Sequence, residues 1–172
     1  MIEKLTLKGP VIAVPEEKEV CNIIVMLHGY GSNGQDLLPI GYEIQKSFPN
    51  IFFSFPNAPF KFESNINMRK WFEVYPNGIP VDQASTHQQK VVIEEFYKSS
   101  QLIKEHVSNL REKYNINLNK FFLLGFSQGS MMSIEVGTNL ESPIAGILSL
   151  SGRIWAPENF TKIDRKQTPI LL

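Results

Sequence analysis

The stretch FFLLGFSQGS, residues 121–130, decides the fold of this chain. Its first half is an apolar run typical of a buried parallel strand. A GxSxG pattern follows at once, and the helical stretch 131–140 comes directly after it. Gly125 and Gly129 would give the backbone room to pass through a sharp turn between strand and helix. The pattern therefore predicts that Ser127 projects its hydroxyl above a sheet, as the nucleophile of an elbow does.

Further apolar runs bounded by turn residues predict other buried parallel strands. With the central run included, the predicted strands are 20–27, 51–55, 120–126, 144–150 and 168–172. The clearest helix is predicted over 85–114, where Ser85 and Gln88 have the spacing of a capping box. Its apolar stripe at helical spacing consists of Val92, Phe96, Leu102, Ile103, Val107 and Leu110. Strands that alternate with helices predict an α/β fold, a mostly parallel sheet with helices on both faces.

The composition narrows the function classes. With 172 residues and 42% hydrophobic residues, one domain over residues 1–172 is expected. Seventeen basic residues balance seventeen acidic ones, which argues against nucleic acid or an anionic membrane as partner and favours a small neutral substrate. No apolar run approaches the ~18 residues of a membrane span, and the N-terminal residues lack the apolar core of a signal peptide, so a cytoplasmic location is expected. Cys21, the only cysteine, excludes an internal disulfide and is predicted to be an inert small hydrophobe.

A second glycine motif, LHGYGSNGQDL, occupies residues 27–37 after a predicted strand. Its glycines let the backbone curl so that amide N–H groups point outward, which suits an oxyanion hole. Such a hole takes one donor from the residue after the nucleophile and one from an early loop. These donors would be the backbone amides of Gln128 and Tyr30. The same stretch also predicts a capping box from Ser32 to Gln35.

Residues 57–83 differ from the rest of the chain. Their proline, glycine and asparagine content, together with unpaired aromatic residues, predicts a long structureless connection. Loops of this length inside a compact domain are usually functional.

These motifs together resemble the phospholipase/carboxylesterase branch of the α/β hydrolases, which groups carboxylesterases and acyl-protein thioesterases. The matching strings are VMLHGYGSNGQDLL (25–38), FPNAP (55–59), MRKWFEV (68–74), LLGFSQGSMMS (123–133) and GILSLSG (146–152). They occur in family order, and GFSQG preceded by a long HGxG loop is the most specific of them. Ser130 departs from the pattern, because the family usually has glycine there, but its small side chain should fit the turn.

The resemblance implies an α/β-hydrolase fold and cleavage of carboxylic ester or thioester bonds through an acyl-serine intermediate, without metal or organic cofactor. Ser127 would be the nucleophile, and the Tyr30 and Gln128 amides would be the oxyanion donors. Trp71 and Phe72 would form walls of the acyl or alcohol pocket, outside the main core. A lactone hydrolase and a peptidase are the alternatives among enzymes.

None of the three histidines is a convincing base. His28 belongs to the HG signature and is expected to shape its loop. His106 lies on the apolar stripe of the long helix and is expected to be a partly buried, hydrogen-bonded histidine. His87 falls in the first turn of that helix and is expected to be exposed.

The family's triad order is the main departure, because no histidine follows Ser127. The family's acid follows a strand that resembles TPILL, residues 168–172, whereas Asp164 precedes it and is expected in a surface loop. The chain therefore resembles a family member without its last strands, its acid and its base. A complementing C-terminal fragment is then a candidate partner. The competing hypothesis is a catalytically dead remnant that binds an acyl ligand or a partner.

Overall fold

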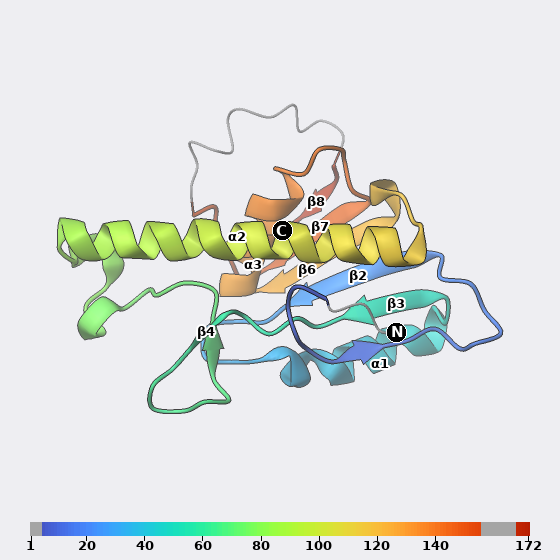
Figure 1. The fold of residues 1–172 in the computed structure, drawn as a ribbon, viewed down its shortest axis with the longest axis horizontal. Helices are drawn as coiled ribbons and strands as arrows, with labels where there is room; N and C mark the ends of the chain where they lie inside the picture. The colour runs from blue at the N-terminus through green and yellow to red at the C-terminus, as the bar shows by residue number, and fades with distance from the viewer. Residues whose placement is uncertain (1–4, 156–167) are drawn as a thin grey trace.

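In a computed structural model, residues 5–155 and 168–172 are described, and within them a six-stranded sheet has the order β1-β3-β2-β6-β7-β8 (Figure 1). The strands are β1 (Val11–Ile12), β2 (Asn22–Leu27), β3 (Ile51–Ser54), β6 (Phe121–Phe126), β7 (Gly146–Leu150) and β8 (Ile170–Leu171). Only β1 runs antiparallel to its neighbour; the other pairs are parallel. The predicted mostly parallel sheet is therefore confirmed.

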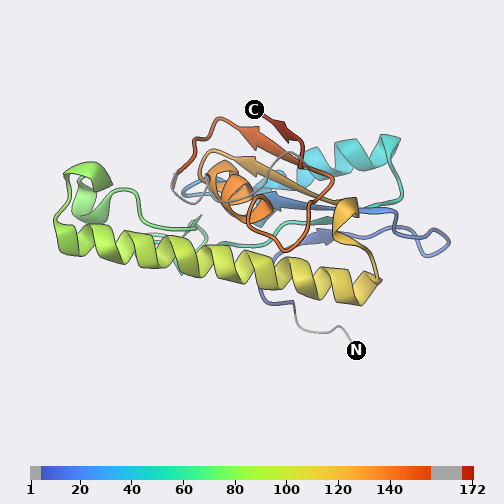
Figure 2. The ribbon, with the colours of Figure 1, turned by 90° about the horizontal axis from the view of Figure 1, so that it is seen from above.

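Helices cover both faces of this sheet, as Figure 2 shows from above. The helices α2 (Thr86–Tyr114) and α3 (Gln128–Gly137) pack on one face, where Val25 and Leu123 point into the larger core. The helix α1 (Leu38–Ser47) lies on the other, where Met26 and Leu124 point into a smaller core. Neighbouring strand residues enter opposite cores because side chains alternate along a strand. Burial on both faces explains why these strands are continuously apolar.

The long helix α2 begins and ends as its sequence requires. Ser85 Oγ accepts from the Gln88 amide at 3.4 Å, and Gln88 Oε1 accepts from the Ser85 amide at 3.0 Å, which confirms the predicted capping box. Asn115 ends the helix in the left-handed region at φ 50°. Of the predicted stripe, Val92, Phe96, Ile103, Val107 and Leu110 are buried, and Leu102 is partly buried.

The prediction that residues 57–83 are structureless is wrong. They contain a small hairpin of β4 (Phe60–Lys61) and β5 (Arg69–Lys70), followed by the 3-10 turns η2 (Pro76–Gly78) and η3 (Val81–Gln83). Strands of two residues are too short to produce an alternating pattern, so the sequence gives no periodic signal for them.

Two smaller predictions are also corrected. The capping box after the second glycine motif belongs to Asn33 and Asp36, at the start of η1 (Gly34–Leu37), and Ser32 Oγ instead donates to Asp36 Oδ2 at 2.6 Å. Cys21 is exposed, because it lies one residue before β2 and outside the sheet. Among the described helices, none is both long and apolar enough to cross a bilayer.

Candidate active site

Ser127 lies at the junction of β6 and α3, at the carboxyl end of the strand. Its φ of 51° and ψ of −114° fall outside the regions that non-glycine residues normally adopt. Its amide donates to the Leu150 carbonyl at 2.8 Å, so β7 fixes the turn from the side. The side chain is partly exposed. The predicted sharp, strained turn is therefore confirmed, and strain of this kind is typical of functional positions.

The two glycines of the GxSxG pattern are required by close backbone packing. A Cβ on Gly129 would lie 2.0 Å from the Leu27 carbonyl oxygen, and one on Gly125 would lie 2.2 Å from the Gly129 carbonyl oxygen. Neither contact leaves room for a side chain. The turn therefore packs directly on the end of β2, where the second glycine motif begins.

The second motif lies beside the turn. A Cβ on Gly29 would be 3.6 Å from Ser127 Cβ, an ordinary contact distance. Gly31 adopts a φ of 79°, which lets the chain reverse after Tyr30. Within residues 5–155 and 168–172, the amides of Tyr30 and Gln128 donate no hydrogen bond. The structure thus brings both predicted donor residues to the same end of the sheet with their N–H groups available.

The side chain of Gln128 is buried and binds the tryptophan segment. Its Oε1 accepts from the Trp71 amide at 2.8 Å, and its Nε2 donates to the Phe72 carbonyl at 2.6 Å. The Trp71 indole donates to the His28 carbonyl at 2.9 Å, and Ser99 Oγ of α2 donates to the Trp71 carbonyl. These bonds connect the serine turn, the glycine loop and α2 through one segment.

The prediction that Trp71 and Phe72 lie outside the main core is wrong. Both side chains are 0% exposed and belong to the larger core. The amide, indole and carbonyl of Trp71 and the carbonyl of Phe72 are hydrogen-bonded to Gln128, His28 and Ser99, which offsets the cost of burying these polar groups. The sequence suggested a loop position and could not reveal these distant partners.

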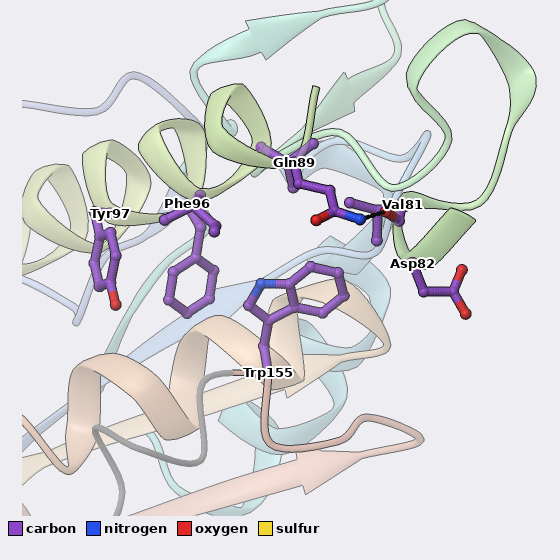
Figure 3. A pocket seen from close by; sticks show the side chains of 8 residues that line it. Val81, Asp82, Gln89, Phe96, Tyr97 and Trp155 are labelled. Atoms are coloured by element: carbon purple, nitrogen blue, oxygen red, sulfur yellow. Dashed lines mark hydrogen bonds between the residues drawn. The ribbon is translucent and has the colours of Figure 1, made fainter. Parts of the chain in front are cut away.

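The described part of the chain does contain an apolar cavity of about 290 Å³ (Figure 3). Its lining residues are Val81, Asp82, Gln89, Val92, Ile93, Phe96, Tyr97 and Trp155. Trp155 also packs against Phe72, with 4.7 Å between ring centroids, so Phe72 supports the cavity wall from behind. The sequence predicts no pocket role for Phe96 or Trp155, and the helical stripe is the only signal for Phe96.

The environments of His28 and His106 agree with their predicted roles. His28 is buried; its Nε2 accepts from the Ala58 amide at 3.1 Å, and its Nδ1 lies 2.8 Å from the Gly29 carbonyl. His106 is buried between Ser54 Oγ and the Leu7 amide. Burial lowers the pKa of each imidazole to about 4.

No histidine serves as a base for Ser127 in this arrangement. Both buried histidines use their ring nitrogens elsewhere, and His87 is exposed, as predicted. Within the described residues, Ser127 Oγ makes no hydrogen bond. Asp164 lies outside the described residues.

We expect Trp71→Ala to lower the free energy of unfolding by about 3–5 kcal/mol, because it removes a large, fully buried side chain and leaves the His28 carbonyl without its donor. Urea unfolding measures this loss. Trp155→Ala is the matched control, since Trp155 is only partly buried. An equal or larger loss of unfolding free energy in Trp155→Ala would contradict the assignment of Trp71 to the core.

Comparisons with known proteins agree on one group. The family model described as phospholipase/carboxylesterase matches residues 7–172. Acyl-protein thioesterase 1 of Candida albicans is 34% identical over 136 residues, covering 75% of this chain and 55% of that protein. The protein of the same name from Debaryomyces hansenii is 28% identical over 164 residues, covering 89% and 68%. This chain thus spans about half the length of the first of these relatives.

Solved structures agree as well. The crystal structure of esterase PE8 superposes with a TM-score of 0.79 at 32% identity, covering 96% of this chain and 73% of that one. SOBER1 from Arabidopsis thaliana gives a TM-score of 0.61 at 24% identity, covering 87% and 71%, and supports the fold alone.

Proposed function

The chain belongs to the phospholipase/carboxylesterase family of α/β hydrolases, and on this premise we propose that it is a serine hydrolase that cleaves carboxylic ester or thioester bonds. Ser127 is the proposed nucleophile, and the backbone amides of Tyr30 and Gln128 are the proposed oxyanion donors. The substrate is a small ester or thioester, and the reaction passes through an acyl-serine intermediate.

One observation carries this proposal: a strained serine turn lies against a glycine loop, and each contributes an amide without an acceptor. A helix N-terminus adds to the effect, because the first N–H groups of α3 have no partner in the helix and favour negative charge. Both features suit the negative oxygen of a tetrahedral intermediate.

In the proposed reaction, Ser127 Oγ attacks the substrate carbonyl carbon as a base accepts its proton. The carbonyl oxygen becomes negative between the two amides. When the intermediate collapses, the alcohol or thiol leaves with a proton and the acyl group remains on Ser127. Water then attacks the acyl-serine, which releases the carboxylic acid and restores the hydroxyl.

The base is proposed to be a histidine oriented by an aspartate, supplied by a C-terminal segment of the family type or by a complementing fragment. The three histidines of residues 1–172 make other contacts or lie exposed, which supports this assignment. We call residues 1–172 followed by a family-like segment with an HG-containing turn, an aspartate and a later histidine the extended chain.

The apolar part of the substrate is proposed to bind the cavity beside Phe96 and Trp155. Gly152 packs against the serine turn, where a Cβ would lie 3.0 Å from the Ser127 carbonyl oxygen. The segment that contacts the serine turn at Gly152 therefore continues directly to Trp155 in the cavity wall. Phe72 and Trp71 would act behind this wall, as buried supports of the pocket.

A fluorophosphonate probe tests the nucleophile directly, because it reacts covalently with activated serines. We expect the extended chain to be labelled at Ser127, as located by peptide mass spectrometry, and Ser127→Ala to abolish the label. Ser130→Ala is the matched control: its hydroxyl is buried against Ser149 Oγ at 2.5 Å, so labelling should persist.

The competing hypothesis of a dead remnant that binds an acyl ligand predicts a different outcome. The extended chain would then stay unlabelled and inactive although it folds. Labelling at a residue other than Ser127 would contradict the assigned mechanism.

A further inference from the structure

The backbone near Tyr30 is hydrogen-bonded on both sides of this residue. The Gly31 amide donates to the Arg69 carbonyl at 2.9 Å, and the Arg69 amide donates to the Ser32 carbonyl at 3.0 Å. These two bonds pair the loop with β5 just after Tyr30. Just before Tyr30, the Gly29 carbonyl accepts from the Ser32 amide at 3.2 Å and lies 2.8 Å from His28 Nδ1. Within the described residues the Tyr30 amide and carbonyl make no hydrogen bond, so the other anchor of Tyr30 is its side chain.

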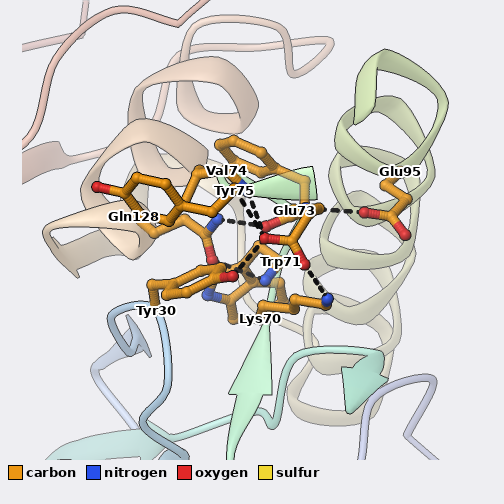
Figure 4. Close-up of polar contacts among 9 residues, drawn as sticks. Tyr30, Lys70, Trp71, Glu73, Val74, Tyr75, Glu95 and Gln128 are labelled. Atoms are coloured by element: carbon orange, nitrogen blue, oxygen red, sulfur yellow. Dashed lines mark hydrogen bonds and ion pairs between the residues drawn. The ribbon is translucent and has the colours of Figure 1, made fainter. Parts of the chain in front are cut away.

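The side chain of Tyr30 is held at its ring and at its hydroxyl. The ring packs edge-on against Phe62, with 4.9 Å between centroids. The hydroxyl donates to Glu73 Oε1, as Figure 4 shows. A ring held at both ends restrains the Cα to which it is attached, and together with the bonds of the Gly29 carbonyl it fixes the direction of the Tyr30 amide.

Glu73 is in turn held by several donors. Its Oε1 also accepts from the amides of Val74 and Tyr75, both at 2.9 Å, and its Oε2 pairs with the Lys70 ammonium. Its own amide donates to Glu95 Oε2 of α2 at 2.8 Å, so the segment is tied to the long helix (Figure 4). Burial raises the pKa of Glu73, but the bonds from Lys70, Tyr30 and Tyr75 outweigh it and hold the pKa below its usual value. The carboxylate therefore stays charged at neutral pH.

The same short segment also holds the second proposed donor. Gln128 is bound through its side chain to Trp71 and Phe72, and Tyr30 is bound through its hydroxyl to the next residue, Glu73. Three consecutive residues thus link the two proposed oxyanion donors. An oxyanion hole works only when both amides reach the same oxygen at about 2.7–3.1 Å.

We infer that Glu73 is a positioning residue of the oxyanion hole, which acts through the Tyr30 hydroxyl to aim the Tyr30 amide at the same point as the Gln128 amide. This inference rests on the proposed function. Glu73 touches no reacting atom in it. Its charge matters because a charge-assisted hydrogen bond is stronger than a neutral one and fixes the ring more firmly.

The test uses residues 1–172 as they stand, because an oxyanion hole without a complete triad still accelerates hydrolysis by about 10³ to 10⁴ over water. Hydrolysis of p-nitrophenyl acetate is measured for Tyr30→Phe and Glu73→Gln. We expect kcat to fall about 10- to 100-fold with little change in KM, since a displaced donor is felt mainly by the transition state. The double variant should be no slower than the slower single variant, because both changes break one chain of contacts.

Tyr75→Phe is the matched control. The Tyr75 ring lies 6.2 Å from that of Tyr30, and its hydroxyl has no hydrogen bond within the described residues. Its kcat should equal that of the unmodified chain. Hydrogen exchange at the Gly31 amide gives a readout besides activity: we expect it to rise about 10-fold in Tyr30→Phe and Glu73→Gln, with the Leu123 amide of β6 unchanged.

Several outcomes overturn the inference. They are an unchanged kcat in folded Tyr30→Phe, an effect of the variants on KM alone, or a double variant in which the two losses of kcat multiply. A hydrolysis rate of unmodified residues 1–172 no higher than that of buffer would overturn it as well. The nucleophile is judged separately by Ser127→Ala. A turnover of the extended chain that survives Ser127→Ala would contradict the proposed nucleophile, whereas a residual rate of residues 1–172 that falls in Tyr30→Phe would still support the role of Glu73.

Discussion

The extended chain is expected to hydrolyse a short-chain p-nitrophenyl ester up to about 10⁶-fold faster than residues 1–172 alone. A serine hydroxyl is a weak nucleophile until a base accepts its proton. In residues 1–172, the two buried histidines are bound elsewhere and the third is exposed, so none of them fills this role. The amides of the proposed oxyanion hole remain, and they account for a residual acceleration only.

The control is Ser127→Ala in the extended chain, which should return turnover to about the level of residues 1–172. Residues 1–172 and the extended chain should show similar KM for the ester if the added segment supplies chemistry rather than the pocket. The opposite outcome is equally clear. If residues 1–172 alone match the extended chain in a Ser127-dependent way, then His28, His87 or His106 supplies the base and the proposed mechanism is wrong.

Acidification is expected to destabilise the fold by about 3 kcal/mol for each of His28 and His106 between pH 7 and pH 4, at 1.36 kcal/mol per pKa unit. Burial lowers both pKa values from 6.5 to about 4. Below pH 6.5 the unfolded chain therefore binds protons that the folded chain does not. The stabilisation is complete above about pH 6.5 and is lost progressively as the pH falls to about 4.

The hydrogen bonds of the two rings explain why the neutral forms are preferred. A ring nitrogen that accepts from an amide carries no proton, so the other nitrogen carries it. In His28, Nε2 accepts from Ala58 and Nδ1 donates to the Gly29 carbonyl. In His106, Nδ1 accepts from Leu7 and Nε2 donates to Ser54 Oγ. Protonation would replace each accepted amide bond with a repulsive contact.

Urea unfolding at a series of pH values measures this dependence. His106→Gln should remove about half of the loss between pH 7 and pH 4, although it lowers stability at neutral pH. His87→Gln is the matched control, because His87 is exposed and should leave the pH dependence unchanged. A pH dependence that is the same in His106→Gln as in the unmodified chain would contradict the argument.

Local patterns were enough to predict the elements that carry the site. The central strand, the glycines of the turn and the capping box at Ser85 each depend on residues a few positions apart, so their sequence signals are complete. The strained turn at Ser127 follows from the same short-range order. Strand boundaries shifted by one or two residues, as at β2, because strand ends depend on pairing with neighbours. The helix α3 begins and ends three residues earlier than predicted, because it starts directly after Ser127.

The sequence by itself determined the strand, turn and helix around Ser127, the loop of Tyr30 and the family. Only the tertiary structure decided that Trp71 and Phe72 enter the core, that Trp155 lines a cavity, and that Glu73 binds Tyr30. The physical reason is sequence separation: the bond from Tyr30 to Glu73 spans 43 residues and that from Trp71 to Gln128 spans 57. Such bonds follow no helical or strand period, so they arise only when the sheet brings distant segments together.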